Sequence, residues 1–424
     1  MKLGDYVEIK SGKLNSDQAV DSGAYPFFTC AREVLRINKW EHDREAVLLG
    51  GNNANAVFPV FYYNGKFTAR QRVYVIWSID TDALDNRYLY YLIQTATQQF
   101  GQFSLGTTTK FITLGMLTGL DAPLPHINEQ RAIGSVLGSL DDKIELNRRM
   151  NRTLEQMAAA IFEAWFVDFE PVRAKASGAA SFPGMPQPVF DALPATFANS
   201  ELGPNPEGWV VKPLEECAEA MKGLSYKGAG LLKDPAQYCQ GLPLHNLNSV
   251  LEGGGYKYAG IKYYGGDFKE RHVLEPGDVI VTNTEQGFEY RLIGFPAIVP
   301  GCFGDRGLFS HHLFRIRPLD EAALPKLFLY HAVMSWRLRE EIIGHTNGTT
   351  VNMLAADGLQ RPRIVLPPQA LAGGFDSIVA PIHQLVEQNH GESKTLSETR
   401  DALLPKLLSG EVRVSDTAEM EVAR

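Results

Sequence analysis

The sequence predicts a duplicated α+β protein with two domains, each a twisted sheet or open barrel with added helices, separated by two long helices. Three observations predict this fold class: an internal repeat, two segments rich in short strand-like runs, and a heptad seam that follows each of those segments. The long helices are expected to pair as an antiparallel coiled coil about a pseudo-twofold axis.

The internal repeat has two offsets. The triplet Gly106–Thr108 recurs as Gly348–Thr350, 242 residues later (348 minus 106), and this offset aligns similar residues without gaps over about sixty positions. The beginning of the chain recurs at a smaller offset, because residues 3–12 resemble residues 214–223, 211 residues later (214 minus 3). The second half therefore has 31 more residues in its middle (242 minus 211). The two halves share one scaffold but differ in the middle, as expected for a protein that recognises two different targets.

The elements follow in the order domain, helix, linker, domain, helix and tail. Their expected bounds are 1–125 for the first domain, 126–170 for the central helix, 171–208 for the linker, 209–366 for the second domain, 367–412 for the distal helix and 413–424 for an acidic tail. Both domains contain short β-branched and aromatic runs, such as Val47–Leu49 and Asp278–Val281. One helix is expected in each domain, over residues 86–99 and 324–343. The seven prolines of residues 171–208 predict an extended, partly ordered linker.

Each long helix has a seam that steps alternately by three and four residues, which indicates a coiled coil. Both copies place asparagine in the seam, at Asn147 and Asn389, and an antiparallel pairing could bring these two residues together. Such a polar residue costs stability but fixes the register of the helices. Pro381 and Pro405 are expected to kink or shorten the distal helix. The predicted seam consists of Leu137, Leu140, Ile144, Asn147, Leu154, Ile161, Val379, Ile382, Val386, Asn389, Leu396 and Leu403.

The net charge of −8 argues at first against a protein that binds nucleic acid. However, residues 1–125 contain 12 basic and 12 acidic side chains, and residues 209–366 contain 17 of each, so the surplus of acid lies in the connecting segments. Each domain can therefore gather basic groups on one face. The sequence has no apolar run long enough to span a membrane and no apolar signal core at its start, which predicts a cytoplasmic location.

The sequence lacks the motifs of the enzymes that modify or translocate DNA. An adenine methyltransferase would need an Asn/Asp-Pro-Pro-aromatic loop, whereas the pair Asn205–Pro206 continues into Glu207. There is no G-x-x-x-x-G-K-[ST] loop to hold ATP. The four cysteines are far apart and have no C-x-x-C spacing, so no metal site is expected. The sequence therefore predicts a chain that performs no catalysis itself.

The run from Gly106 to Thr113, followed by Pro-Leu-Pro-His-Ile-Asn-Glu-Gln over residues 123–130, resembles the specificity subunits of Type I restriction–modification systems. In that family a G-T-T-x-K-x-I/L turn closes a target recognition domain, and a P-L-P-x-x-x-E-Q stretch opens the conserved central helix. Residues 140–147, 164–169 and 403–410 resemble the central and distal conserved regions in the family's order. The second copy departs from the pattern, because Gln369–Leu371 replaces the Glu-Gln pair and Val351–Asn352 replaces Thr109–Lys110.

The resemblance implies a bipartite reader of double-stranded DNA for phage defence by restriction and methylation. Each target recognition domain would read one half of an asymmetric site, and the paired helices would hold the two domains apart. Two methylation subunits and two restriction/translocase subunits would assemble on the chain. S-adenosylmethionine, ATP and Mg²⁺ are expected on those partners in this multisubunit restriction endonuclease and DNA adenine methyltransferase, and no cofactor is expected in this chain.

Base edges are read by side chains with paired donors and acceptors, chiefly Arg, Lys, Asn and Gln. The asparagine run can alternatively be an Asx-type turn, and Arg70 and Arg72 can be solvated strand residues. Residues 107–110 can form a structural turn and not a phosphate-binding site. The candidate DNA-binding residues are Asn52, Asn53, Asn55, Arg70, Gln71, Arg72, Thr107, Thr108, Thr109, Lys110, Asn283, Glu285, Gln286, Arg291, Thr349, Thr350 and Asn352.

Two pairs of residues have competing interpretations. His311–His312 is interpreted as a polar strand or loop end, with a DNA contact as the alternative, because adjacent strand residues point to opposite faces and do not share a metal ion. Trp165 and Phe166 are expected to be exposed and to contact a methylation subunit, with simple packing as the alternative.

Three other functions are alternatives to a specificity subunit. A methylation system that lacks its nuclease would use this chain in the same way. A single-chain restriction enzyme is disfavoured because the cofactor and nuclease motifs are missing. A coiled-coil interaction protein unrelated to DNA would have no salt-dependent affinity for a duplex.

Overall fold

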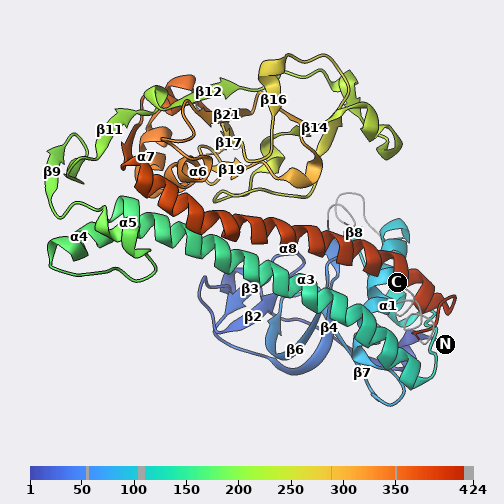
Figure 1. Ribbon diagram of the computed structural model, residues 1–424. Helices are drawn as coiled ribbons and strands as arrows, with labels where there is room; N and C mark the ends of the chain where they lie inside the picture. Colours follow the sequence, from blue (N-terminus) through green and yellow to red (C-terminus); the bar gives the residue numbers. More distant parts are fainter. Residues whose placement is uncertain (54–56, 104–109, 288, 349–350, 415–424) are drawn as a thin grey trace. The chain divides into compact units, whose positions relative to one another are not determined.

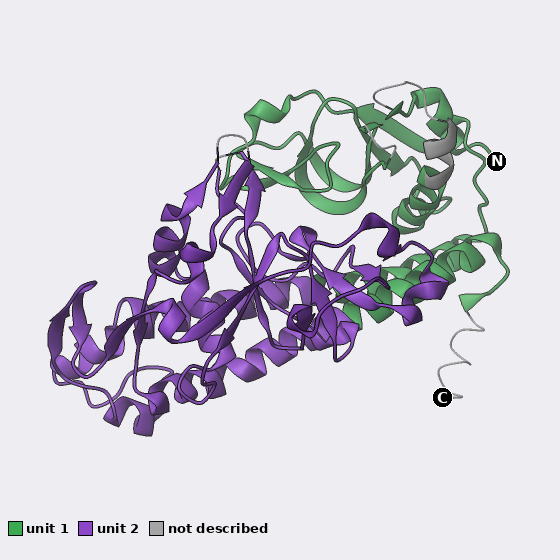
Figure 2. Cartoon of the chain, turned by 90° about the horizontal axis from the view of Figure 1, so that it is seen from above, with its two compact units in different colours: residues 1–146, 392–424 green, residues 147–391 purple. Residues whose placement is uncertain are grey.

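The computed structural model describes residues 1–53, 57–103, 110–287, 289–348 and 351–414. The chain forms two compact units, of which unit 1 contains residues 1–146 and 392–424 and unit 2 contains residues 147–391 (Figure 2). Both long helices pass from one unit into the other. Each unit thus consists of one mixed helix-and-sheet domain and a segment of each long helix, and no closed barrel forms among the described strands.

Unit 1 contains a six-stranded sheet in the order β1–β7–β4–β6–β2–β3, in which only the β2–β6 pair is parallel. A short second pair joins β5 to β8. Helix α1 (Asn86–Phe103) packs on β4, β6 and β7, which confirms the helix expected over residues 86–99. The other elements are β1 (Val7–Ser11), β2 (Tyr25–Phe28), β3 (Leu35–Ile37), β4 (His42–Gly50), β5 (Asn52–Asn53), β6 (Val60–Ala69), β7 (Val73–Ser78), β8 (Lys110–Phe111) and α2 (Leu114–Thr118).

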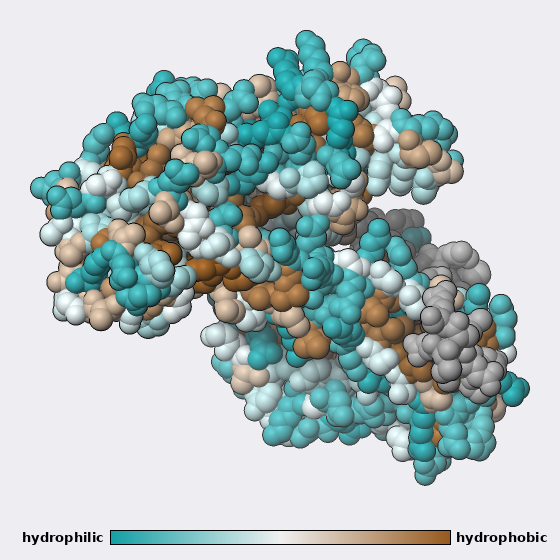
Figure 3. All heavy atoms as spheres, viewed as in Figure 1, coloured by the Kyte–Doolittle hydropathy of each residue, from teal (hydrophilic) through white to brown (hydrophobic). Residues whose placement is uncertain are grey.

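Strand β4 shows why this sheet forms. Its residues alternate between two faces, and both faces of its second half are covered, so residues 46–49 form a continuous apolar run. Val47 and Leu49 pack into the core beneath α1, whereas Ala46 and Leu48 pack into a second core on the other face. The outer surface of the same domain is mainly hydrophilic in the view of Figure 3.

Unit 2 contains a four-stranded sheet β12–β21–β17–β19, a five-stranded sheet β13–β15–β14–β20–β16, a three-stranded sheet β18–β23–β22 and the pairs β9–β10 and β11–β24 (Figure 1). These strands are β9 (Phe197–Ser200), β10 (Gly203–Pro206), β11 (Val210–Pro213), β12 (Ala218–Lys222), β13 (Leu231–Leu232), β14 (Leu242–His245), β15 (Lys262–Tyr264), β16 (Val273–Leu274), β17 (Val279–Thr282), β18 (Thr284–Gln286), β19 (Pro296–Ile298), β20 (Gly307–Phe309), β21 (Leu313–Pro318), β22 (Thr346–Asn347), β23 (Val351–Leu354) and β24 (Arg363–Leu366).

The single helix expected over residues 324–343 is wrong. Two helices form instead, α6 (Lys326–Met334) and α7 (Trp336–Gly344), and Ser335 between them has an extended ψ of 143°. A ψ in the extended region ends the α-helical hydrogen-bond pattern, and the apolar periodicity of the sequence continues across that break.

The internal repeat is visible in the register of the strands. Lys2 forms an isolated antiparallel bridge with Asp121, and Pro213 pairs with Arg363 in the same way at the two offsets of the repeat. Gly12 and Gly223 also correspond, because a Cβ at either position would come within 2.3 Å or 2.2 Å of a backbone carbonyl oxygen of the neighbouring turn. A side chain is therefore excluded at both positions by the same close backbone approach.

The long helices are α3 (Ile127–Phe162), which continues into a π-helical turn over Glu163–Val167, and α8 (Gln369–Ser409). In unit 2, Asn147 Nδ2 donates to the Asn389 carbonyl (3.4 Å), and Asn389 Nδ2 donates to Asn151 Oδ1 (2.8 Å). Asn151 Nδ2 in turn donates to the Val386 carbonyl (3.2 Å). The predicted meeting of Asn147 with Asn389 is confirmed, and within this unit the partners follow in antiparallel order.

The helices also lie side by side in unit 1. Lys143 pairs with Glu392 (3.2 Å), and Arg400 Nη1 lies 2.5 Å from Asp141 Oδ1. Arg400 occupies a seam position that would otherwise be apolar, and the ion pair satisfies its charge there. Of the predicted seam, Leu137, Ile144, Asn147, Val379, Val386 and Asn389 are buried, and Leu140, Leu154, Ile161, Ile382, Leu396 and Leu403 are half-buried.

Of the two effects expected from the prolines, a kink or a shortening of the distal helix, the shortening is wrong. Helix α8 continues for 41 residues through both Pro381 and Pro405. Both prolines are exposed, so the carbonyl groups that lose a hydrogen-bond partner can bind water, and the seam residues hold the helix together on the other side.

The expectation of an extended linker over residues 171–208 is also wrong. The segment folds into α4 (Glu170–Ala176), α5 (Gln187–Asp191) and the β9–β10 hairpin, and it buries Val172, Met185, Phe190 and Leu193 in the core of unit 2. Prolines stand in the first turn of both helices, where no backbone N–H is needed.

The expectation that Trp165 and Phe166 are exposed is wrong as well. Their exposed fractions are 3% and 4%, and Phe166 packs edge-on against Phe328 (4.9 Å) and Phe375 (5.4 Å) between ring centroids. These aromatic residues join the end of α3 to the core of unit 2, and they offer no surface to a partner subunit.

The acidic tail from residue 415 onward lies outside the described residues. Val412 and Val414, just before it, pack against the core of unit 1. Among the described helices, none combines the length and the apolar character that crossing a membrane requires.

Candidate nucleic-acid interface

Three segments of unit 1 that are far apart in the sequence meet at one place. They are residues 51–53, 70–72 and 110–112, which we call the first cluster. The Gly51 N–H donates to the Arg72 carbonyl (2.7 Å), and the Ile112 N–H donates to the Gly51 carbonyl (2.9 Å). Strand pairing places Asn53 opposite Lys110. The backbone therefore gathers the asparagine, arginine and lysine positions that the sequence proposed separately.

Unit 2 contains the same arrangement in residues 283–285, 310–312 and 352–354, which we call the second cluster. The Asn283 N–H donates to the His312 carbonyl (3.0 Å), and the Leu354 N–H donates to the Asn283 carbonyl (2.8 Å). Strand pairing places Glu285 opposite Asn352. The two clusters thus share the same backbone bonds in the same order, each inside its own unit.

The middle segment of each cluster is a tight turn between two strands. The Val73 N–H donates to the Arg70 carbonyl (3.0 Å), and the Leu313 N–H donates to the Ser310 carbonyl (2.9 Å). Arg72 has a φ of 66°, which is uncommon for a residue other than glycine. Its carbonyl bond to Gly51 holds this conformation in place.

The first cluster carries cations. Gln71 and Arg72 are exposed, whereas Arg70 and Lys110 are half-buried. Within the described part of the chain, no carboxylate lies at ion-pair distance from Arg70, Arg72 or Lys110. Such cations beside the amides of Asn52 and Asn53 suit a ligand with phosphate groups and base edges.

The second cluster carries few exposed charges. Asn283 and Asn352 are 1% and 3% exposed, and their side-chain amides donate to the backbone carbonyls of His311 and Gly287. The Glu285 carboxylate accepts from the backbone N–H groups of residues 291, 292 and 293 at 2.8–3.0 Å. Glu285 and Asn352 therefore hold the loop that follows β18, and Asn283 holds the turn between β20 and β21.

Two further predicted residues of unit 2 face solvent. Gln286 is exposed, and Arg291 is exposed and paired with Glu289 (2.8 Å). Asn55, Thr107, Thr108, Thr109, Thr349 and Thr350 lie outside the described residues, so the structure does not test their predicted roles.

The expected place of His311 and His312 at the end of a strand or loop is confirmed. They lie in the turn between β20 and β21, and their rings are 3.9 Å apart between centroids, so the expected orientation to opposite faces is wrong. They occupy the positions of Gln71 and Arg72 in the first cluster. Aligning the strand that follows each turn, Val73–Ser78 with Leu313–Pro318, would have shown this correspondence.

Both clusters have an apolar side chain at the same position in the strand pairing. Phe111 is opposite Asn52, and Met353 is opposite Thr284; their exposed fractions are 37% and 46%. An exposed apolar group next to polar amides can contact a thymine methyl group or a base face.

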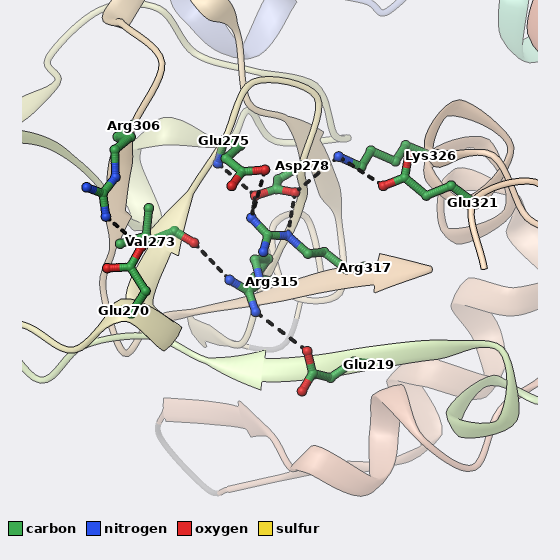
Figure 4. Close-up of polar contacts among 10 residues, drawn as sticks. All are labelled: Glu219, Glu270, Val273, Glu275, Asp278, Arg306, Arg315, Arg317, Glu321 and Lys326. Atoms are coloured by element: carbon green, nitrogen blue, oxygen red, sulfur yellow. Dashed lines mark hydrogen bonds and ion pairs between the residues drawn. The ribbon is translucent and has the colours of Figure 1, made fainter. Parts of the chain in front are cut away.

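Several basic residues of unit 2 are used inside the domain (Figure 4). Asp278 is fully buried and accepts from Arg317 Nε (2.8 Å) and Nη2 (2.6 Å). Its hydrogen bonds raise the pKa of Arg317 above the ordinary range for arginine. Arg315 Nη1 donates to the Val273 carbonyl (2.8 Å), and Lys326 lies 3.6 Å from Asp278. These cations hold β17, β21 and α6 together.

No metal centre is indicated by the described residues. Among them, no three His, Cys, Asp or Glu side chains are grouped so that they could hold a metal ion.

Comparison with known proteins adds independent information. A family model for the Type I restriction modification DNA specificity domain matches residues 1–156. The MjaIX specificity subunit of Methanocaldococcus jannaschii is 27% identical over 343 residues, which cover 80% of this chain and 72% of that protein. The EcoDI specificity subunit of Escherichia coli is 30% identical over 244 residues, 56% of this chain and 51% of that protein.

One solved structure supports the fold. The crystal structure of a Type I restriction–modification S subunit from M. genitalium aligns with a TM-score of 0.56 and covers 96% of this chain and 95% of that one. At 16% sequence identity, this likeness concerns the fold alone.

Proposed function

We propose that the chain is a specificity subunit of a Type I restriction–modification system, which binds a bipartite, asymmetric DNA site and carries the subunits that act there. In this proposal each unit supplies one target recognition domain. The chain itself performs no catalysis. S-adenosylmethionine, ATP and Mg²⁺ are used by two methylation subunits and two restriction/translocase subunits.

The observation that carries the proposal is the pair of clusters. Their backbone bonds coincide, but their side chains differ at nearly every position. Backbone bonds set where a side chain is presented, and side-chain donors and acceptors decide which base edge it fits. A frame repeated with different side chains suits the recognition of two different half-sites, whereas a symmetric site would favour two identical clusters.

The first cluster supplies both kinds of contact that DNA recognition needs. Arg72 and Lys110 are cations without an ion-pair partner among the described residues, so they can neutralise phosphates. Asn52 and Asn53 carry amides that can pair with a base edge, and a good bidentate pair of this kind discriminates by about 1–3 kcal/mol.

The helices supply the scaffold in this proposal. The seam contacts of Asn147, Asn151 and Asn389 fix which residues of α3 and α8 face each other. A fixed register sets the spacing between the two recognition domains, and therefore the length of the unspecified gap in the target. The partner subunits dock on surfaces other than Trp165 and Phe166, which are buried.

Modified-base sequencing of host DNA tests the proposal. One host expresses this chain with the methylation subunit of its own system, and the control host expresses that methylation subunit alone. We expect methylated adenines only in the first host, in a split motif with a gap of constant length. If the methylation is absent, or has the same pattern without this chain, the chain is not the source of specificity, and an interaction protein unrelated to DNA is favoured.

A variant pair sharpens the same experiment. Arg72→Ala should relax one half-motif and leave the other unchanged. Arg131→Ala is the matched control, because Arg131 is also an exposed arginine of unit 1 but pairs with Asp82 (2.9 Å), beyond the opposite end of β7. The control should leave both half-motifs as they are.

A further inference from the structure

We propose that the His311–His312 turn contacts DNA as the counterpart of the Gln71–Arg72 turn, so that the second half-site is held in a pH-dependent way and the first is not. This inference rests on the proposed function and names a contact element of the second domain.

The positions of the two turns agree bond by bond. The Arg70 N–H donates to the Phe28 carbonyl and the Ser310 N–H to the His245 carbonyl, both at 2.9 Å. Each turn follows a strand that pairs in parallel with its neighbour. Each also precedes a strand that pairs with β1 in one domain and with β12, its counterpart at the 211-residue offset, in the other. The same backbone frame therefore presents Gln71 and Arg72 in one domain and His311 and His312 in the other.

The histidine turn is joined to the rest of the second cluster. The His312 ring is hydrogen-bonded to Thr284 Oγ1 (2.9 Å), and its carbonyl accepts from the Asn283 N–H (3.0 Å). His311 packs near the Tyr226 ring, 6.5 Å between centroids. Its buried Nδ1 has no hydrogen-bond partner among the described residues. The neighbouring residues therefore hold this turn in place.

The groups that face the histidines do not neutralise them. His311 and Lys222 of β12 are the charged or titratable groups that act on His312, and both oppose its protonation. Tyr226 and Thr284 face the turn from the other sides, and the Glu285 carboxylate is occupied by backbone N–H groups. Burial, followed by these charges, lowers the pKa of His312 below its ordinary value of 6.5.

The consequence for DNA binding follows from linkage. At neutral pH His312 is mostly uncharged in the free protein, whereas the Arg72 guanidinium is always charged. A DNA phosphate beside the turn stabilises the protonated ring, so binding takes up a proton. Affinity for the second half-site should therefore rise as the pH falls, by up to about tenfold for each unit by which DNA raises a histidine pKa.

The test measures duplex binding by the full chain assembled with its methylation subunits, at constant salt, between about pH 6 and about pH 8. The duplex carries the target motif, and two further duplexes have one half-motif altered. We expect the wild-type complex to bind the target about tenfold more tightly at the lower pH. The complex with H311A/H312A should bind weakly and with a nearly flat pH profile.

Two further variants separate a contact from a structural role. H311Q/H312R transfers the side chains of the first turn to the second and should keep tight binding while abolishing its pH dependence. Thr284→Val removes the hydrogen bond to His312 but leaves both rings, and should keep the pH dependence.

The possible outcomes distinguish this inference from the function on which it rests. If the wild-type complex prefers the target motif but its pH profile equals that of H311A/H312A, the histidine contact is refuted and the proposed function stands. If the complex shows no preference for the motif at either pH, both are refuted.

Discussion

The two clusters differ in charge although their backbone bonds coincide. The first presents Arg70, Arg72 and Lys110, which have no carboxylate partner among the described residues, and the second presents two histidines and few exposed cations. In the second domain, basic residues are used instead to hold the fold together. The comparison teaches that the repeated frame is a property of the backbone, and that each domain divides its charges differently between structure and recognition.

The interior of the two sheets shows the same division. Val47 pairs with Ile76 in unit 1, and Val279 pairs with Ile316 in unit 2. These two pairs occupy equivalent positions in their sheets, so the residues that flank them can be compared one by one. The charged set of unit 2 is Asp278, Arg315 and Arg317, and its counterpart in unit 1 is the apolar set Ala46, Val75 and Trp77. One domain therefore has an apolar layer where the other has a buried ion network.

The largest expected effect comes from breaking that network. Asp278→Ala leaves Arg317 without its buried partner and should lower the free energy of unfolding of unit 2 by about 3–5 kcal/mol. Glu321→Ala removes an exposed carboxylate from Lys326 and should cost about 0–1 kcal/mol. Hydrogen exchange assigned to each unit measures both. Equal effects of the two substitutions would show that the buried network is not what stabilises the second domain.

The second expected effect concerns acid stability. Burial lowers the pKa of His331 to about 3 and that of His383 to about 4, and their Nε2 atoms are 3.0 Å apart in unit 2. Because the unfolded rings have a pKa near 6.5, the unfolded chain binds more protons below that pH, and stability is lost as the pH falls from there towards the folded values.

At about pH 5 each ring should cost unit 2 about 2 kcal/mol relative to neutral pH. Hydrogen exchange at the two pH values should show unit 2 opening before unit 1. Parallel loss of protection in both units would contradict the assignment of this acid sensitivity to the histidine pair.

The third effect concerns the helix seam, in which the sequence predicted the contact between Asn147 and Asn389. Asn151→Ala removes the acceptor for Asn389 Nδ2 and should cost about 1–3 kcal/mol. Replacing both Asn151 and Asn389 by leucine should restore stability but relax the register of the helices. Thermal unfolding, with cysteine cross-linking to report the register, measures both. A single register in the double variant would show that apolar packing alone fixes it.

The smallest effect concerns the first cluster. Lys110→Ala should weaken duplex binding by about 1 kcal/mol at all sequences and reduce the slope of affinity against salt by about one phosphate contact. Lys39→Ala, an exposed lysine that donates to Gln18, should change neither quantity. Titration at several salt concentrations distinguishes the two, and equal slopes for both variants would remove Lys110 from the interface.

Much of this architecture could be predicted because it depends on local periodicity. The seam predicted the contact of Asn147 with Asn389, and the strand-like runs and helix α1 were found where β-branched and apolar residues recur. The asparagine run and the Arg70–Arg72 turn were recognised separately from their residue types. That they share one cluster could not be predicted, because non-local strand pairing brings them together.

The errors have a common physical origin. Trp165 and Phe166 lie on a helix whose pattern does not say what covers it, and the core of unit 2 covers them. The proline-rich segment folds because its apolar residues are buried by that same core. Helix α8 passes through two prolines because its seam outweighs the lost hydrogen bonds. In each case tertiary packing overrides a local rule.

Domain exchange tests the central claim, that the two clusters read separate half-sites, most directly. Residues 1–125 are replaced by the corresponding domain of another specificity subunit, and the methylated motif is read by modified-base sequencing. The account predicts that one half of the motif changes while the other half and the gap stay the same. A motif that changes in both halves, or in neither, would contradict it.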